Sequence, residues 1–187
     1  VIGGGNVKIH NFDYAQHPIE LLDINLSPVS GKISNIVTVL DKEPLNIVSR
    51  VNRKISDFDG DFKGDVFLSF PLDKDLKMEE VVYKGRASSQ NLTVRNAFQD
   101  IVFEQGAVDI SVDTKELVIK GQGSVDGEQV KDLYLKEDIS GEQTPRTHVA
   151  FKSKMKTDKI SRFTDVLDPY LSGKAFVEFD YKDNRKS

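Results

Sequence analysis

The sequence contains no cysteine and no tryptophan, and it has only three histidines and two methionines. The absence of cysteine excludes disulfides, thiolate nucleophiles and cysteine-ligated zinc. The histidines, His10, His17 and His148, lie far apart without the short spacing that metal sites and catalytic triads use. We therefore expect a protein that is not an enzyme, with no catalytic residues, no metal and no cofactor.

Long apolar runs and a charge excess are also missing. No uninterrupted apolar run exceeds three residues, whereas a membrane-spanning helix needs about 20. The chain does not start with basic residues followed by an apolar stretch, so we expect no signal peptide. The net charge of −4 argues against nucleic acid as a partner. The chain begins at Val1 rather than Met, which we interpret as a fragment or a processed product.

The most informative feature is alternation. Side chains of a strand point to opposite faces at every second residue, and in 106–113 the apolar residues Val108, Ile110 and Val112 alternate with polar ones. Asp126-Gly127 predicts a type I′ hairpin, and Gly121 and Gly123 predict a bulge or bend. We expect about nine or ten antiparallel strands, within 7–10, 19–26, 65–70, 81–87, 106–113, 116–121, 121–125, 130–135, 146–156 and 175–181.

Two segments have the period of a helix instead. Apolar residues at i, i+3, i+4 or i+7 predict short helices at 32–41 and 159–168, and the two segments resemble each other in sequence. In the strands that follow them, Gly64, Phe67 and Phe70 align with Gly173, Phe176 and Phe179. We interpret 1–187 as a single β-rich segment of a longer repeat array, with repeat units of about 1–157 and 158–187, the second truncated.

Three further stretches carry a resemblance to a known family. They are Leu40-Asp41-Lys42-Glu43-Pro44-Leu45, then Gly64 to Leu72 with Asp75-Leu76 and Glu80 to Tyr83, and finally Gly121 to Val130. Together they resemble the AsmA-like, YhdP-type envelope proteins of Gram-negative bacteria, over roughly 33–156. The resemblance contains no catalytic motif.

The resemblance implies a location and a function. Such proteins have one anchor in the inner membrane and a long periplasmic stack of antiparallel β repeats, which is thought to conduct phospholipids between the inner and outer membranes. The anchor is not in this chain, which fits an excised piece. The expected partners are phospholipid acyl chains, neighbouring repeats of the parent chain and envelope proteins.

The expected fold is therefore mainly all-β with two short α-helices, in which a curved antiparallel meander forms an open apolar groove. Two short helices cannot cover the apolar face of about ten strands, and a large exposed apolar surface usually marks a binding site. The alternation alone is equally typical of a β-sandwich, which is the alternative fold. The residues expected to line the groove are Val66, Leu68, Phe70, Val108, Ile110, Val112, Val149 and Phe151.

Two functions remain open on the sequence. The first is a non-catalytic segment that conducts lipid along the groove. The second is a structural or assembly module for outer-membrane biogenesis that binds protein partners through open sheet edges. The acidic run from Asp57 to Asp61 resembles the start of a calcium loop, but an EF-hand requires glycine and glutamate where Phe62 and Leu68 stand. We therefore expect a solvated acidic turn there.

Overall fold

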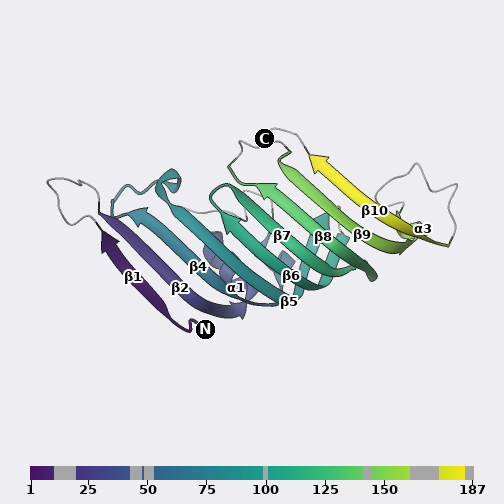
Figure 1. The fold of residues 1–187 in the computed structure, drawn as a ribbon, viewed down its shortest axis with the longest axis horizontal. Coiled ribbons are helices and arrows are strands. Elements are labelled where there is room, and N and C mark those ends of the chain that lie inside the picture. The colour runs from purple at the N-terminus through teal and green to yellow at the C-terminus, as the bar shows by residue number, and fades with distance from the viewer. Residues whose placement is uncertain are drawn as a thin grey trace.

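A computed structural model describes residues 1–10, 20–42, 48, 53–98, 101–140, 145–160 and 173–183. The described strands form one antiparallel sheet in the order β1-β2-β4-β5-β6-β7-β8-β9-β10, with β3 paired to β5 (Figure 1). The strands are β1 (Gly5–His10), β2 (Leu21–Lys32), β3 (Phe58–Asp59), β4 (Asp61–Pro71), β5 (Val82–Phe98), β6 (Ile101–Asp113), β7 (Glu116–Val125), β8 (Glu128–Asp138), β9 (Thr147–Lys156) and β10 (Lys174–Asp183).

The sheet is open and curved, and it does not close on itself (Figure 1). This confirms the expected antiparallel meander. The alternative β-sandwich is not formed, because every strand in the described part of the chain belongs to the same sheet.

Local turn chemistry explains the connections. Asp126 and Gly127 have φ angles of 48° and 79°, which is the left-handed backbone of a type I′ turn, and Val125 pairs with Glu128 across it. The register between β7 and β8 shifts between Gly121 and Gly123, as predicted. A Cβ on Gly121 would lie 2.2 Å from the carbonyl oxygen of Ala107, so only glycine permits this close approach of β6 and β7.

Helix α1 (Ile33–Leu40) confirms the first predicted helix. Helix α3 (Thr157–Ile160) begins two residues before the second predicted one, and positions 161–168 of that prediction lie outside the described residues. Two 3-10 turns, η1 (Ile55–Asp57) and η2 (Met78–Glu80), were not expected.

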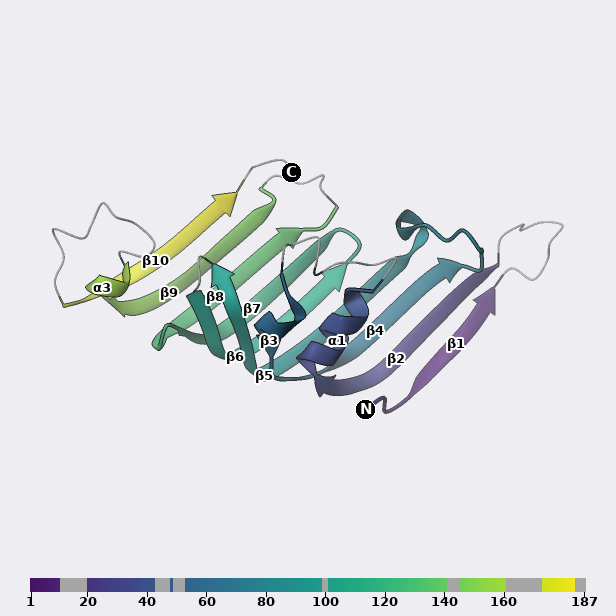
Figure 2. The ribbon, with the colours of Figure 1, turned by 180° about the vertical axis from the view of Figure 1, so that it is seen from behind.

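The core lies on one face of the sheet. Seen from behind, α1 and β3 lie in front of the strands (Figure 2). Ile33 and Val37 of α1 join Phe62 in a buried cluster that continues through Val130 to Met155. The parts of β5 and β6 that lie beyond the first of their three register shifts contribute Leu92, Ile101 and Phe103 to this cluster. The cover therefore sits over the middle of the sheet.

The repeat units 1–157 and 158–187 stay a prediction. α1 lies in the chain between β2 and β4, which are antiparallel neighbours in the sheet. α3 lies in the same way between the antiparallel neighbours β9 and β10. The two aligned glycines differ, however. A Cβ on Gly64 would lie 2.0 Å from the carbonyl oxygen of Arg86, whereas Gly173 has φ +89° and nothing within 4 Å.

Candidate functional site

The strand register places all eight predicted lining residues on one face. In an antiparallel sheet, directly opposed side chains point to the same side. Val66 is opposite Gly85, which is opposite Val112. In the same way Ile110 connects through two intervening strands to Val149. The other four follow by alternation along their strands: Leu68 and Phe70 on β4, Val108 on β6 and Phe151 on β9.

The eight residues differ in accessibility. Val108 and Phe151 are only 3% and 6% exposed and belong to the buried cluster. The other six are half-buried. Leu68, Phe70 and Val112 pack around a second small cluster formed by Val81 and Tyr83. A ligand on this face would therefore meet the six half-buried side chains, and the other two support the sheet from within the core.

The apolar face extends beyond the predicted set toward β1. Leu26, Ile24 and Leu22 of β2 are opposite Val66, Leu68 and Phe70, and they are half-buried. On β1, Val7 and Ile9 continue the same face and are 63% and 39% exposed. The alternation in 7–10 and 19–26 carried this signal. The face is thus closed in the middle and becomes more open toward the β1 edge.

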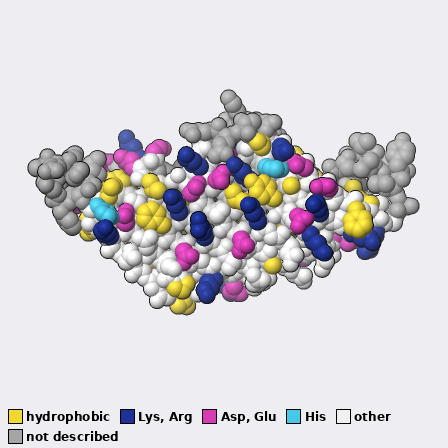
Figure 3. All heavy atoms as spheres, viewed as in Figure 1, with side chains coloured by type: hydrophobic (Ala, Val, Ile, Leu, Met, Phe, Trp, Pro, Cys, Tyr) yellow, Lys and Arg dark blue, Asp and Glu magenta, His cyan; other side chains and the backbone are white. Residues whose placement is uncertain are grey.

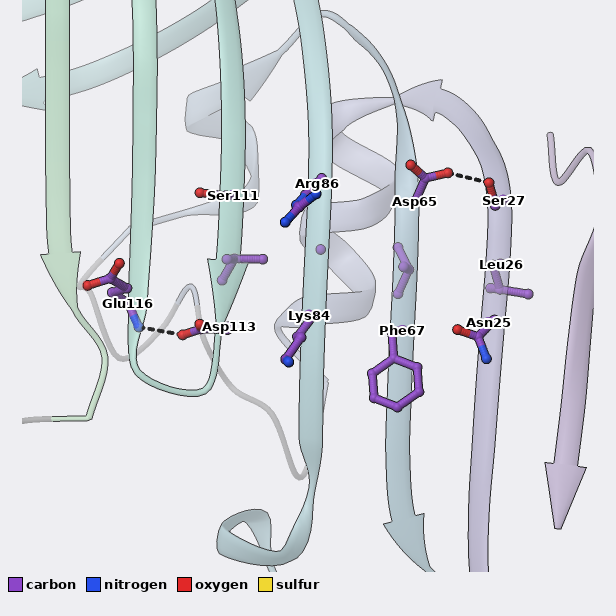
Figure 4. A pocket seen from close by; sticks show the side chains of 13 residues that line it. Asn25, Leu26, Ser27, Asp65, Phe67, Lys84, Arg86, Ser111, Asp113 and Glu116 are labelled. Carbon is purple, nitrogen blue, oxygen red and sulfur yellow. Dashed lines mark hydrogen bonds between the residues drawn. The ribbon is translucent and has the colours of Figure 1, made fainter. Parts of the chain in front are cut away.

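The opposite face of the sheet is mainly polar, with hydrophobic side chains scattered among the charged ones (Figure 3). It carries Lys, Arg, Asp and Glu side chains of both signs, distributed over the strands (Figure 3). Two neighbouring hollows of about 510 and 580 Å³ lie on it, and they share Asp65, Arg86, Ser111 and Glu116 in their walls. Arg86 and Lys84 project from β5 between Asp65 and Phe67 on one side and Asp113 on the other (Figure 4).

Three of the four carboxylates that line these hollows are already bound. The Ser27 hydroxyl donates to Asp65 (Figure 4). Asp113 accepts the backbone N–H groups of Lys115 and Glu116 at 2.8 and 3.0 Å. Glu116 pairs with Lys136 at 2.7 Å, and the hydrogen bond that the Lys136 ammonium donates to the Glu116 carboxylate raises the pKa of Lys136. These contacts tie turns and neighbouring strands together and leave no free carboxylate pair for acid–base chemistry among them.

Other ionisable groups also bridge neighbouring strands. His10 Nε2 lies 2.7 Å from Asp23 Oδ2, and His148 Nε2 lies 3.2 Å from Asp180 Oδ1. The third histidine, His17, lies outside the described residues. The pKa of Asp23 is lowered mainly by a hydrogen bond from Ser69. Within the described ranges, no group of three or more potential ligands is placed to hold a metal ion.

The acidic run from Asp57 to Asp61 has a structural role. Asp57 is buried and accepts hydrogen bonds from the Lys54 N–H at 3.0 Å and from the Asn96 amide at 3.2 Å. Asp61 pairs with Lys32 at 2.8 Å, and this bond lowers the pKa of its carboxyl. The expectation of a solvated turn is therefore wrong for Asp57, because its carboxylate caps the short helix η1.

No helix in the described part of the chain combines the length and the apolar character needed to cross a membrane. Comparison with protein-family models, with curated proteins and with solved structures gives no match. The function must therefore be argued from the geometry of the two faces.

Proposed function

We propose that this chain is a non-catalytic segment of a periplasmic envelope protein that binds phospholipid acyl chains on its apolar face and conducts them between the inner and outer membranes. The parent protein would be anchored in the inner membrane, as the resemblance to AsmA-like proteins implies. The observation that carries the proposal is the continuous apolar face of an open sheet, which runs from β1 to β10 and has only a partial cover.

Acyl chains suit such a surface because burial of each CH₂ contributes about 0.8 kcal/mol, or on the order of 10 kcal/mol for a 16-carbon chain. This interaction has no directional requirement, so it needs no conserved polar motif. Val66, Leu68 and Phe70 on β4, with Ile24 on β2 beside them, offer side chains that are neither fully buried nor fully exposed.

Photo-crosslinking tests this proposal with a matched pair of positions. A photoreactive amino acid at Leu68 should capture phospholipid in a Gram-negative cell envelope, and the same substitution at Phe67 should not. Both residues lie on β4, but they point to opposite faces of the sheet. Ile110 on β6 provides an independent position on the apolar face. Equal lipid capture at Phe67 and Leu68 would count against the proposal. So would the absence of lipid capture at both Leu68 and Ile110.

The second candidate is a structural or assembly module that binds protein partners through its sheet edges. Among the described residues β1 has a single neighbour, β2, and its Val7 and Ile9 side chains are exposed. This favours the second candidate, because an unpaired edge is a template for another strand. Native mass spectrometry after gentle extraction distinguishes the two candidates. Bound phospholipid supports the carrier, and a bound polypeptide supports the assembly module.

A further inference from the structure

A basic patch lies on the mainly polar face of the sheet, over β8, β9 and β10. Strand register and alternation place five lysines and one phenylalanine together there, and all six side chains are exposed. At the β10 end of this face, hydrophobic and basic side chains lie side by side at the surface (Figure 3). The residues of the basic patch are Lys131, Lys152, Lys154, Lys156, Lys174 and Phe176.

Several lysines of the basic patch are opposite other lysines. Lys131 is directly opposite Lys152 across β8 and β9, and Lys156 is directly opposite Lys174 across β9 and β10. Like charges in directly opposed positions destabilise a strand pair. Along β9 three lysines repeat at every second residue, roughly 7 Å apart. The sheet therefore concentrates positive charge at this place although the repulsion opposes folding.

Carboxylates compensate only part of this charge. Lys152 Nζ lies 3.3 Å from Asp132 Oδ2, and Lys174 Nζ lies 4.0 Å from Glu128 Oε2. Glu178 is opposite Lys152 in the register. The other three lysines of the basic patch form no ion pair within the described part of the chain. Since the whole chain has a net charge of −4, the basic patch is a local feature that the overall composition does not explain.

An exposed aromatic ring lies among these lysines. Phe176 is 87% exposed and is opposite Lys154 across β9 and β10. The Lys154 ammonium lies 5.4 Å from the centre of the ring, which is the distance of a cation–π contact. Most of the ring is nevertheless in contact with water, which is unfavourable for an apolar side chain. The basic patch thus combines excess positive charge with one accessible apolar group.

We propose that the basic patch is a docking surface for an anionic lipid bilayer. The negative surface potential of such a bilayer attracts lysines, and each lysine near the surface raises the binding constant about fivefold. The Phe176 ring enters the boundary between headgroups and acyl chains, while the ammonium groups of the lysines remain in water. The docking surface lies on the face opposite the apolar one, so the proposal does not depend on lipid conduction.

The side chains of the basic patch favour a bilayer over a single-stranded nucleic acid. Grooves for single strands combine basic residues with several aromatic rings, on which successive bases stack, whereas the basic patch has one ring. It also contains no arginine, the residue whose planar guanidinium binds individual phosphates in a bidentate way. Lysine ammonium groups are point charges without this directionality, which suits a diffuse negative surface. Because the basic patch lies on a face of the sheet, a strand added beside β10 would extend this face and would not cover it.

Vesicle cosedimentation tests the charges. The purified protein should bind vesicles that contain phosphatidylglycerol more tightly than vesicles of phosphatidylcholine alone, and added salt should reduce the difference. Lys154→Gln combined with Lys156→Gln should weaken binding to the anionic vesicles by about 25-fold, whereas arginine at both positions should preserve it. Lys8→Gln combined with Lys63→Gln is the matched control, because it removes the same charge from exposed positions on the same face, at β1 and β4. This control should change the binding by about twofold or less.

Fluorescence tests the aromatic ring. The chain contains no tryptophan, so Phe176→Trp introduces a single reporter, whose emission should shift to shorter wavelength when anionic vesicles are added. Phe67→Trp is the matched control on the same face. It lies on β4, six strand spacings or roughly 29 Å from β10, and its emission should not shift. Phe176→Ser should weaken binding to the anionic vesicles by about tenfold.

Four results would overturn the proposal. The first is a wild-type protein that does not bind anionic vesicles at low salt. The second is an equal loss of binding in the two double glutamine variants, because net charge alone would then govern the interaction. The third is an equal emission shift for Phe176→Trp and Phe67→Trp. The fourth is tighter binding to a single-stranded oligonucleotide than to anionic vesicles, which would assign the basic patch to a different class of partner.

Discussion

The gradient of burial along the apolar face can be tested by two truncations. Met155 is 1% exposed and belongs to the main buried cluster, whereas Val7 on the β1 edge is 63% exposed. Both side chains project from the same face of the sheet. If α1, β3 and the ends of β5 and β6 close the middle of that face and leave its β1 side open, Met155→Ala and Val7→Ala must differ strongly in cost.

The expected magnitudes follow from the atoms removed. Met155→Ala deletes three heavy atoms, which represents about 2.4 kcal/mol of transfer free energy, and the cavity term brings the loss to about 2–5 kcal/mol. Val7→Ala removes two methyl groups that are about one-third buried, which gives about 0.6 kcal/mol. For a chain of this length the melting temperature should fall by roughly 4–20 °C for Met155→Ala and by roughly 1–2 °C for Val7→Ala.

Urea unfolding followed by far-ultraviolet circular dichroism gives the two free energies of unfolding directly, provided that the denaturant slopes of the variants agree. Equal losses for the two variants would refute the gradient. A large loss at Val7 would mean that the β1 edge is covered in solution, and a small loss at Met155 would mean that the middle of the face is not packed.

Two further predictions concern local chemistry. Gly127→Ala should lower the free energy of unfolding by about 1–2 kcal/mol, because φ is +79° there and the strain comes from the backbone: only Lys159 Nζ lies within reach of a Cβ. Gly127→Asn is the control in urea unfolding, because asparagine tolerates this backbone. Equal losses of stability in the two variants would contradict the turn assignment. The pKa of Asp61 should lie below its ordinary value of 3.8 in a carboxyl-carbon NMR titration, and Asn91→Ala should move it toward 3.8, since Asn91 donates to this carboxylate at 3.1 Å. The Asp61–Lys32 pair then contributes to stability above pH 3.8, and this contribution is lost as the pH falls below that value. The same bond raises the pKa of Lys32 from 10.5, so the contribution is also lost as the pH rises above 10.5. An unchanged Asp61 titration in Asn91→Ala would contradict this account.

The sheet could be predicted from the sequence because one of its faces contacts water and the other faces the apolar core. A strand with one wet and one buried side must alternate, and a shift of one residue would expose the whole apolar set. The alternation of Val108, Ile110 and Val112 therefore fixed both the strand and the side on which these residues lie. The type I′ turn at Asp126-Gly127 could also be predicted from the sequence, because few dipeptides tolerate that backbone.

The elements that cover the middle of the sheet, α1, β3 and the ends of β5 and β6, could not be predicted from the sequence in the same way. β5 continues through Ser88, Ser89, Gln90 and Asn91, a polar run that masks the strand period. Bulges there redirect the chain, so that Leu92 joins the core although its neighbours in sequence are polar. Which apolar residues are closed depends on these long-range contacts, and this is why Val108 and Phe151 were grouped with six more accessible side chains.

A partial cover is the arrangement that a lipid carrier of this kind requires. A fully covered sheet would leave no surface for acyl chains, and a bare one would expose enough apolar area to aggregate. Here Met155, Val130 and Phe62 anchor a closed cluster, which can hold the sheet together whether or not lipid is bound. Ile24, Leu68 and Ile9 lie outside the most deeply buried set, so filling or emptying their side of the face need not unfold the protein. The proposal therefore depends on this separation of a permanent core from an accessible margin on one and the same face.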